Sequence, residues 1–399
     1  MAGQSASLLG SGISSLAVPL LAVMTLHATA AEMGVLQATG RLPYLALALP
    51  AGVWVDRARR RQLLIGTDIV RAVLTLALPI AAFVRILSMP LLWTVALMLS
   101  TASMVFELAY RAYLPTLVGR HFVVEANSRL SASRSTTSIV GPVVGGLLVQ
   151  TLTAPIAILV DALSFVVSST SLLLIRASEA PLVDSPRRRL SSEVRDGVGY
   201  LLGHPTLRVF LLTSGLLNFF LMFPTTLGVL FMIRELHFSP AEIGIVGGIA
   251  APGGVVGALA ANRVHKRLDT GRTLLLSQFI LLAGLVALPV AAGSTLEEMA
   301  ILVAGGLATA FGLSVTNIVS YSYRQAVIPD RLQGRVLAAN LTMTFGVMPA
   351  GSILAGIVGQ TVALRPALWI GVGGSAVAFV ILAISPLREI REATDRRSE

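Results

Sequence analysis

The chain has 399 residues, of which 55% are hydrophobic and only 13% are charged, and its mean hydropathy is +0.81. Soluble domains carry about 25% charged residues, so composition argues strongly against a water-soluble enzyme. Lys and Arg exceed Asp and Glu by ten, but these charges lie in short clusters between apolar runs, which argues against a nucleic-acid-binding patch. Cysteine is absent and the five histidines are scattered, so we expect no disulfide, no metal site and no cofactor.

Apolar stretches recur along the whole chain, each close to the ~20 residues that a membrane-spanning helix needs. The sequence therefore predicts an all-α membrane protein with twelve transmembrane helices, at 5–27, 34–55, 63–84, 91–113, 132–152, 155–175, 207–233, 241–262, 273–293, 298–322, 336–359 and 366–386. A segment rich in Ser, Pro and Arg divides these spans six and six. We expect an N-terminal six-helix bundle over 1–176, a cytoplasmic linker with a short amphipathic helix over 177–206, a C-terminal six-helix bundle over 207–387 and a cytoplasmic tail over 388–399.

The positive charges predict the orientation of the spans. Loops on one side of the membrane hold 25 of the 30 Lys and Arg residues, and basic loops stay in the cytoplasm. We therefore expect a multi-pass protein of the cell membrane with both termini in the cytoplasm. Ala28-Thr29-Ala30 resembles a signal-peptidase site, but no basic segment precedes the first apolar stretch. We expect the first span to be retained rather than cleaved, and the missing basic lead-in suggests a start of translation further upstream.

The two halves of the chain show weak internal symmetry. Asp56 corresponds to Asn262 at an offset of 206, Pro142 to Pro349 at 207, and Asn127 to Asn340 at 213. Two six-helix halves related in this way are typical of secondary transporters.

Motifs in the loops and spans carry a family resemblance. Gly52-x-x-x-Asp56-Arg57-x-Arg59-Arg60-Arg61 resembles the signature loop of the major facilitator superfamily, with Arg59 where the usual form has glycine. Two further motifs are Gly141-Pro142-Val-Val-Gly145-Gly146 and Pro329-Asp-Arg-Leu-Gln-Gly334-Arg335. With these motifs, the chain resembles over almost its whole length the branch that holds the enterobactin exporter and the macrolide-efflux proteins. The resemblance implies two pseudo-symmetric six-helix bundles around a central cavity that work by rocking alternating access.

The resemblance also implies a gating loop made of Gly52, Asp56, Arg57, Arg60 and Arg61. In the family, the Asp is thought to meet the start of span 11, where the positive end of a helix favours a carboxylate, while the arginines reach carboxylates or lipid phosphates. The alternative is an ordinary arginine cluster that only sets topology.

Gly141, Pro142, Gly145 and Gly146 in span 5 resemble an exporter-type helix motif. Glycines four residues apart give a face for close helix contact, and the proline permits a kink. Plain helix packing is the alternative.

Span 4 carries polar residues on one helical stripe, with Ser100, Ser103, Glu107 and Arg111 at i, i+3, i+7 and i+11. Span 10 repeats the pattern with Thr316, Ser320 and Tyr323, and we expect both stripes to face the cavity. Glu107 is the leading candidate for proton coupling because a carboxyl in apolar surroundings can hold a proton. A fixed Glu107–Arg111 ion pair is an equal alternative.

Other charges inside spans are costly and so point to function. Asp161 and Asp68 are further proton-coupling candidates, and Asp68 with Arg71 also extends the cytoplasmic gating loop. Arg41 either pairs with Asp161, which we favour, or meets an anionic substrate. The candidates for contact with substrate are Arg41, Ser103, Arg111, Asn218 and Asn317.

The sequence thus predicts a transporter and not an enzyme, exporting small amphipathic molecules such as a drug, macrolide, siderophore or secondary metabolite by proton antiport. The expected partners are the substrate and membrane lipid, with no nucleic acid and no obligate protein partner, so we expect a monomer driven by the proton gradient. A uniporter or importer on the same fold and a non-transporting ligand-binding membrane protein are the alternatives.

Overall fold

The computed structural model describes residues 2–174 and 198–389, and these residues are almost entirely helical, with no strand among them. Within these ranges, nine helical segments are long and apolar enough to cross a membrane. The chain folds into two compact units. Unit 1 holds the helices up to Leu174 together with His237–Gly248, and unit 2 holds the remaining helices.

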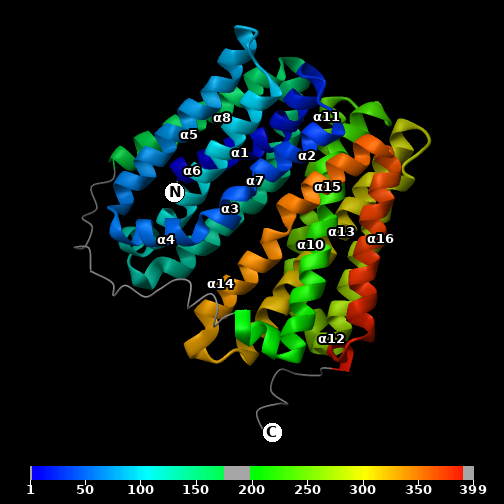
Figure 1. Ribbon diagram of the computed structural model, residues 1–399. Coiled ribbons are helices and arrows are strands. Elements are labelled where there is room, and N and C mark those ends of the chain that lie inside the picture. The colour runs from blue at the N-terminus through cyan, green and yellow to red at the C-terminus, as the bar shows by residue number, and fades with distance from the viewer. Residues whose placement is uncertain (1, 175–197, 390–399) are drawn as a thin grey trace. The chain divides into compact units, whose positions relative to one another are not determined.

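Unit 1 is a bundle in which α5 packs on both α6 and α8, while α1 packs on α7 and α8 (Figure 1). The short helices α2, α3 and α4 all pack on α6. Its elements are α1 (Ala2–Leu20) with the π-helical turn η1 (Leu21–Thr25), α2 (Ala30–Thr39), α3 (Leu42–Ala46), α4 (Ala48–Arg57), α5 (Arg60–Phe83), α6 (Met89–Val118), η2 (Arg120–Phe122), α7 (Val123–Thr151) and α8 (Ala154–Leu174).

In unit 2, α12 packs along α13, and α10 packs on α14, α15 and α16. Its elements are α10 (Pro205–Arg234), α12 (Pro252–Val290), α13 (Thr295–Val327), α14 (Asp330–Gly346), α15 (Met348–Thr361), α16 (Leu364–Ile384) and the turn η3 (Pro386–Glu389). The helix α11 (Pro240–Ala250) begins in unit 1 and ends in unit 2.

The all-α prediction is confirmed, and the difference between twelve predicted spans and nine candidate segments has a local cause at three places. Predicted span 34–55 is divided into α2, α3 and α4 around Arg41 and Leu47. Predicted span 132–152 lies in α7, whose first half is polar, and this helix is not among the nine candidate segments. Spans 241–262 and 273–293 fall in one helical run, Pro240–Val290, whose α12 portion is interrupted at Asp269 with φ 61°.

The predicted linker helix falls mostly outside the described residues. Residues 198–203 are helical, and the buried Leu201 joins a cluster with Leu207, Ile328 and Val336 in unit 2. The end of the linker therefore packs into the C-terminal bundle. The predicted domain bounds stay predictions.

Candidate functional site

The centre of unit 1 buries a charged pair. Asp68 and Arg71 lie one turn apart on α5, are 0% and 5% exposed, and form an ion pair. The second Asp68 oxygen accepts a hydrogen bond of 2.7 Å from Ser168 Oγ of α8. Buried charges are stable only when paired and hydrogen-bonded, and Asp68 meets both conditions.

Two aromatic rings hold the Arg71 guanidinium. Its Cζ lies 3.9 Å from the centroid of Phe106 on α6 and 4.5 Å from that of Phe165 on α8. A guanidinium over ring faces gains cation–π stabilisation, and more so where water is absent. Arg71 is therefore fixed by three helices and does not extend toward a surface.

Asp161 forms the second acidic position of this core. It lies on α8, is 1% exposed, and its Oδ1 is 3.3 Å from Ser164 Oγ. Arg71 interacts with it electrostatically, while forming its ion pair with Asp68. Gly10 of α1 makes room for this carboxyl, because a Cβ there would lie 2.6 Å from Asp161 Oδ1. One guanidinium thus serves two buried carboxyls, and we call Asp68, Arg71 and Asp161 the acidic core.

Glu107 has a different environment. It accepts a hydrogen bond of 2.7 Å from Arg111 and one of 3.4 Å from Arg134 of α7, and its side chain is 30% exposed. The arginine side chains are 69% and 51% exposed. The Glu107–Arg111 pair that the sequence suggested is present, extended by Arg134. Whether Glu107 carries a proton stays a prediction.

Two arginines of the gating loop donate hydrogen bonds to backbone carbonyls of other helices. Arg60 donates to the carbonyl of Ala112 at 3.1 Å, and Arg61 donates to the carbonyls of Leu172 and Leu173 at 3.2 and 3.0 Å. Arg61 therefore ties α5 to the last described turn of α8. Arg57 is exposed, and the Asp56 side chain lies outside the described residues. A Cβ at Gly52 would meet nothing within 4 Å, and the gating role stays a prediction.

The glycines of the exporter-type motif lie at helix contacts. A Cβ at Gly141 would come within 2.8 Å of the Gly12 backbone, and one at Gly145 within 2.9 Å of the Ile13 carbonyl, both on α1. Gly146 faces Pro240 and Gly244 of α11 instead, where Gln150 also accepts a hydrogen bond of 3.0 Å from the Ala241 amide. These residues therefore bring α7 against α1 on one side and α11 on another, and Pro142 lies inside α7 between them.

The remaining substrate-contact candidates are not gathered at one point. Ser103 and Arg111 lie on α6, half-buried and exposed, and Arg41 lies half-buried before α3. The ion pair between Arg41 and Asp161 stays a prediction. In unit 2, Asn218 donates to the Ser214 carbonyl of its own helix at 2.8 Å, whereas Asn317 on α13 is exposed.

The predicted polar stripe of span 10 faces the inside of its own unit. Thr316, Ser320 and Tyr323 are 7%, 5% and 6% exposed. Thr316 shares a hydrogen bond of 2.8 Å with Ser277 of α12, and the ring of Tyr323 lies 5.3 Å from that of Phe210. The neighbouring polar residues Asn317 and Tyr321 of α13 are exposed instead.

Sequence reasoning missed four partners of the acidic core, namely Ser164, Ser168, Phe106 and Phe165. A signal for Ser168 was present, since Asp161, Ser164 and Ser168 repeat at i, i+3 and i+7 along one face of α8. The two rings resemble ordinary core residues in sequence. Over the described ranges, no group of three or more acidic or histidine side chains is placed to hold a metal ion.

Comparisons with known proteins identify the family. A family described as transmembrane secretion effectors matches residues 2–399. Macrolide efflux protein A of Streptococcus pyogenes is 24% identical over 98% of this chain and 95% of its own length. Multidrug efflux pump Tap of Mycolicibacterium fortuitum is 28% identical over 87% of this chain and 85% of its own length.

Solved structures agree in fold. The nucleoside transporter NupG aligns with a TM-score of 0.76 at 17% identity, covering 96% of both chains. A bacterial homologue of the iron transporter ferroportin in an inward-facing state aligns with a TM-score of 0.77 at 17% identity, again over 96% of both chains. At this identity the likeness concerns the fold alone. The chain is a multi-pass membrane transporter, not an enzyme, and belongs to the transmembrane secretion effector family within the major facilitator superfamily.

Proposed function

We propose that this transporter exports small amphipathic molecules from the cell in exchange for protons, with both termini in the cytoplasm. Export is supported by relatives that are named as a macrolide efflux protein and a multidrug efflux pump. The substrate belongs to the class of drugs, macrolides, siderophores or secondary metabolites, since a mildly polar protein surface accepts many amphiphiles.

The acidic core is the observation that carries the proton step. With both carboxyls ionised, Asp68, Arg71 and Asp161 hold two negative charges against one positive charge, at positions 0–5% exposed. An ionised carboxyl without a full partner in a membrane bundle is costly. A proton on one carboxyl removes this excess, so the core is suited to bind and release one proton per cycle.

Asp161 is the better proton acceptor of the two. Asp68 is already paired with Arg71 and accepts from Ser168, whereas the contacts of Asp161 are with the hydroxyls of Ser164, Ser14 and Ser11, besides a longer-range interaction with Arg71. Among the described side chains, the helices packed on α8 bring no further charged group to Asp161. The helix α1 has no charged residue over Ala2–Leu20. The charged groups of α5 on the side of Asp161 are Asp68 and Arg71. The charged side chains of α7 form ion pairs elsewhere.

Glu107 is the alternative acceptor, but two arginines within 3.4 Å stabilise its ionised form. A carboxylate held in that way gives up its charge less readily than one in an apolar core. We therefore assign proton exchange to Asp161. The role we assign to Glu107 is to position Arg111 and Arg134.

The test uses acidified inverted membrane vesicles with a pH dye and a panel of macrolides, lipophilic cations and siderophores. Wild type is expected to dissipate the gradient with its substrate, and Asp161→Asn is expected to abolish this proton flux while leaving downhill substrate movement. Glu107→Gln tests the alternative acceptor. Glu125→Gln is the matched control, because Glu125 pairs with Arg129 on the surface of α7, with both side chains more than half exposed.

Proton flux that survives in Asp161→Asn but not in Glu107→Gln would move the proton site to Glu107. Substrate movement without any proton flux in the wild type would refute antiport and leave a uniporter or importer. Binding without movement would leave a ligand-binding membrane protein.

A further inference from the structure

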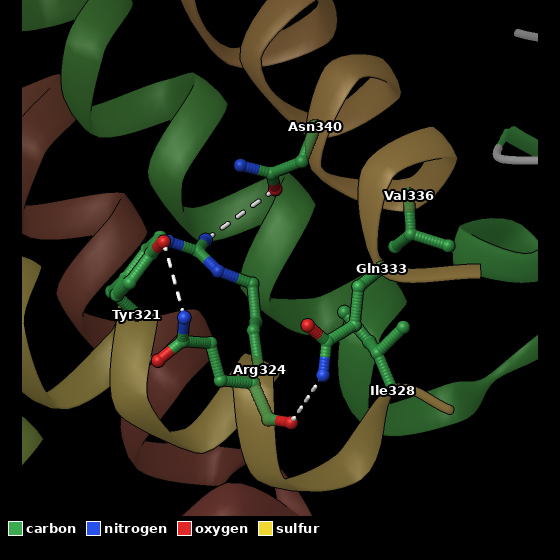
Figure 2. Close-up of a pocket in the computed structure, with 7 residues that line it drawn as sticks. Tyr321, Arg324, Ile328, Gln333, Val336 and Asn340 are labelled. Carbon is green, nitrogen blue, oxygen red and sulfur yellow. Dashed lines mark hydrogen bonds between the residues drawn. The ribbon is translucent and has the colours of Figure 1, made fainter. Parts of the chain in front are cut away.

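We infer that unit 2 carries an anion site, in the pocket between α13 and α14, that binds a phosphate oxyanion through Arg324. The pocket has a volume of about 250 Å³, below the about 300–1,000 Å³ of pockets for drug-sized ligands. Figure 2 shows its lining: Tyr321, Arg324 and Gln325 from α13, Ile328 from the connection, and Gln333, Val336 and Asn340 from α14.

The pocket has both buried and exposed lining residues. Ile328, Val336 and Asn340 are buried, whereas Tyr321 and Gln325 are exposed. None of the seven lining residues that the structure describes is acidic, and four of them carry N–H or O–H donors on amide or phenol groups in addition to the arginine. A site with a cation, several neutral donors and no carboxylate favours an anion.

Hydrogen bonds orient these donors around the arginine (Figure 2). Arg324 Nη1 donates to Asn340 Oδ1 at 3.4 Å, Gln325 Nε2 donates to Tyr321 Oη at 3.2 Å, and Gln333 Nε2 donates to the Gln325 carbonyl at 3.4 Å. Arg324 Nε is buried without an acceptor among the described atoms. A buried donor left unpaired costs free energy, and an oxyanion on the guanidinium fork would supply the acceptor.

Internal symmetry gives an independent reason to expect an external anion. The offset of 213 that relates Asn127 to Asn340 also relates Tyr110-Arg111 to Tyr323-Arg324. In unit 1, Arg111 is neutralised by Glu107 one turn earlier. The residue at the same offset from Glu107 is Ser320, and no ion pair of Arg324 occurs among the side chains that the structure describes. Unit 2 thus has an arginine at the position of Arg111 but a serine at the position of Glu107.

A phosphate suits this site better than a carboxylate. The guanidinium fork binds two oxygens in parallel, and the Asn340 amide and the Tyr321 hydroxyl in the lining are further donors. The oxyanion comes either from the headgroup of an anionic phospholipid or from a soluble phosphate compound. Arg324 lies near the end of α13, adjoining a loop of the basic side of the bundle, where anionic headgroups gather.

The test measures binding to the purified, delipidated full-length chain in a neutral detergent. The probes are short-chain phosphatidylglycerol and inorganic phosphate, with short-chain phosphatidylcholine for comparison. Arg324→Gln is expected to weaken binding at least about tenfold, the effect of losing a charge-assisted hydrogen bond. Asn340→Asp changes almost no volume but places a carboxylate beside Arg324, so it should weaken binding as strongly while the protein stays folded.

Arg272→Gln is the matched control, since Arg272 is an exposed arginine of the same unit and its loss should leave binding unchanged. Binding of phosphatidylglycerol alone assigns the site to lipid, and binding of inorganic phosphate as well assigns it to the phosphate group itself. The inference is overturned if neither probe binds better than phosphatidylcholine, if Arg324→Gln and Asn340→Asp bind like wild type, or if Arg272→Gln loses as much as they do.

Discussion

The two units bury polar groups in different ways. Among the described residues, unit 1 buries Asp68, Arg71 and Asp161 in the middle of its bundle, while the only buried charge of unit 2 is Glu298 in the first turn of α13. Counting 206 residues on, as from Asp56 to Asn262, Arg71 corresponds to Ser277 and Asp68 to Leu274. The ion pair of one repeat is thus replaced by a hydroxyl and an apolar side chain in the other.

On our proposals, this difference separates two tasks. A buried, charge-unbalanced core can respond to protonation, and a core of hydroxyls and apolar side chains cannot. Conversely, the half-exposed Arg324 of unit 2 has no acid where Arg111 of unit 1 has Glu107. On the proposals above, unit 1 exchanges protons and unit 2 binds an anion, and the following substitutions test that contrast.

The largest expected effect is in the acidic core. Arg71→Met should lower the free energy of unfolding by about 3–5 kcal/mol, because it leaves Asp68 buried without its cation. Chemical denaturation in detergent measures this loss. The double substitution Asp68→Asn with Arg71→Met should recover most of it, since no uncompensated charge then remains beside Ser168.

Arg111→Met is the matched control for this prediction. The Arg111 side chain is 69% exposed, and exposed ion pairs contribute about 0–1 kcal/mol. Equal losses in Arg71→Met and Arg111→Met would contradict the distinction between a buried core and a surface pair.

Close helix contact is a feature that the two units should share. A Cβ at Gly145 of unit 1 would lie 2.9 Å from the Ile13 carbonyl, and one at Gly312 of unit 2 would lie 2.7 Å from the Leu281 amide. Backbone atoms cannot move aside easily, so Gly145→Ala and Gly312→Ala should each destabilise the protein by about 1–3 kcal/mol. Thermal unfolding in detergent measures both variants.

Gly52→Ala is the control for steric effects. A Cβ at Gly52 has open space within 4 Å, so the better helix propensity of alanine should raise stability by up to about 1 kcal/mol. If Gly52→Ala is as destabilising as the other two, then loss of stability does not follow from crowding at these contacts.

Sequence and structure agree where periodicity and composition decide the outcome. Long apolar runs such as 366–386 predict α16 to within two residues at either end, and the i,i+4 spacing of Glu107 and Arg111 predicts their ion pair. Contacts between helices are not encoded in this way. The spacing of Thr316, Ser320 and Tyr323 identifies one face of α13, but whether that face meets a cavity or another helix depends on how α13 is rotated against α12 and α10. Likewise, the acidic core joins residues 93 positions apart, from Asp68 to Asp161. No local sequence pattern indicates that the Arg71 guanidinium lies between two aromatic rings.

The smallest effect concerns the polar core of unit 2. Ser277 and Thr316 share a hydrogen bond of 2.8 Å between helices α12 and α13, at the position where unit 1 has Arg71. Ser277→Ala should cost about 1 kcal/mol, because it leaves the buried Thr316 hydroxyl without this partner. Adding Thr316→Val removes the orphaned hydroxyl, so the double variant should be no less stable than Ser277→Ala.

Simple addition of the two single losses in a double-mutant cycle would mean that the hydroxyls are not coupled. A coupling here as large as that between Asp68 and Arg71 would erase the contrast between the two cores, because it would make the hydroxyl pair as strong a constraint on unit 2 as the ion pair is on unit 1.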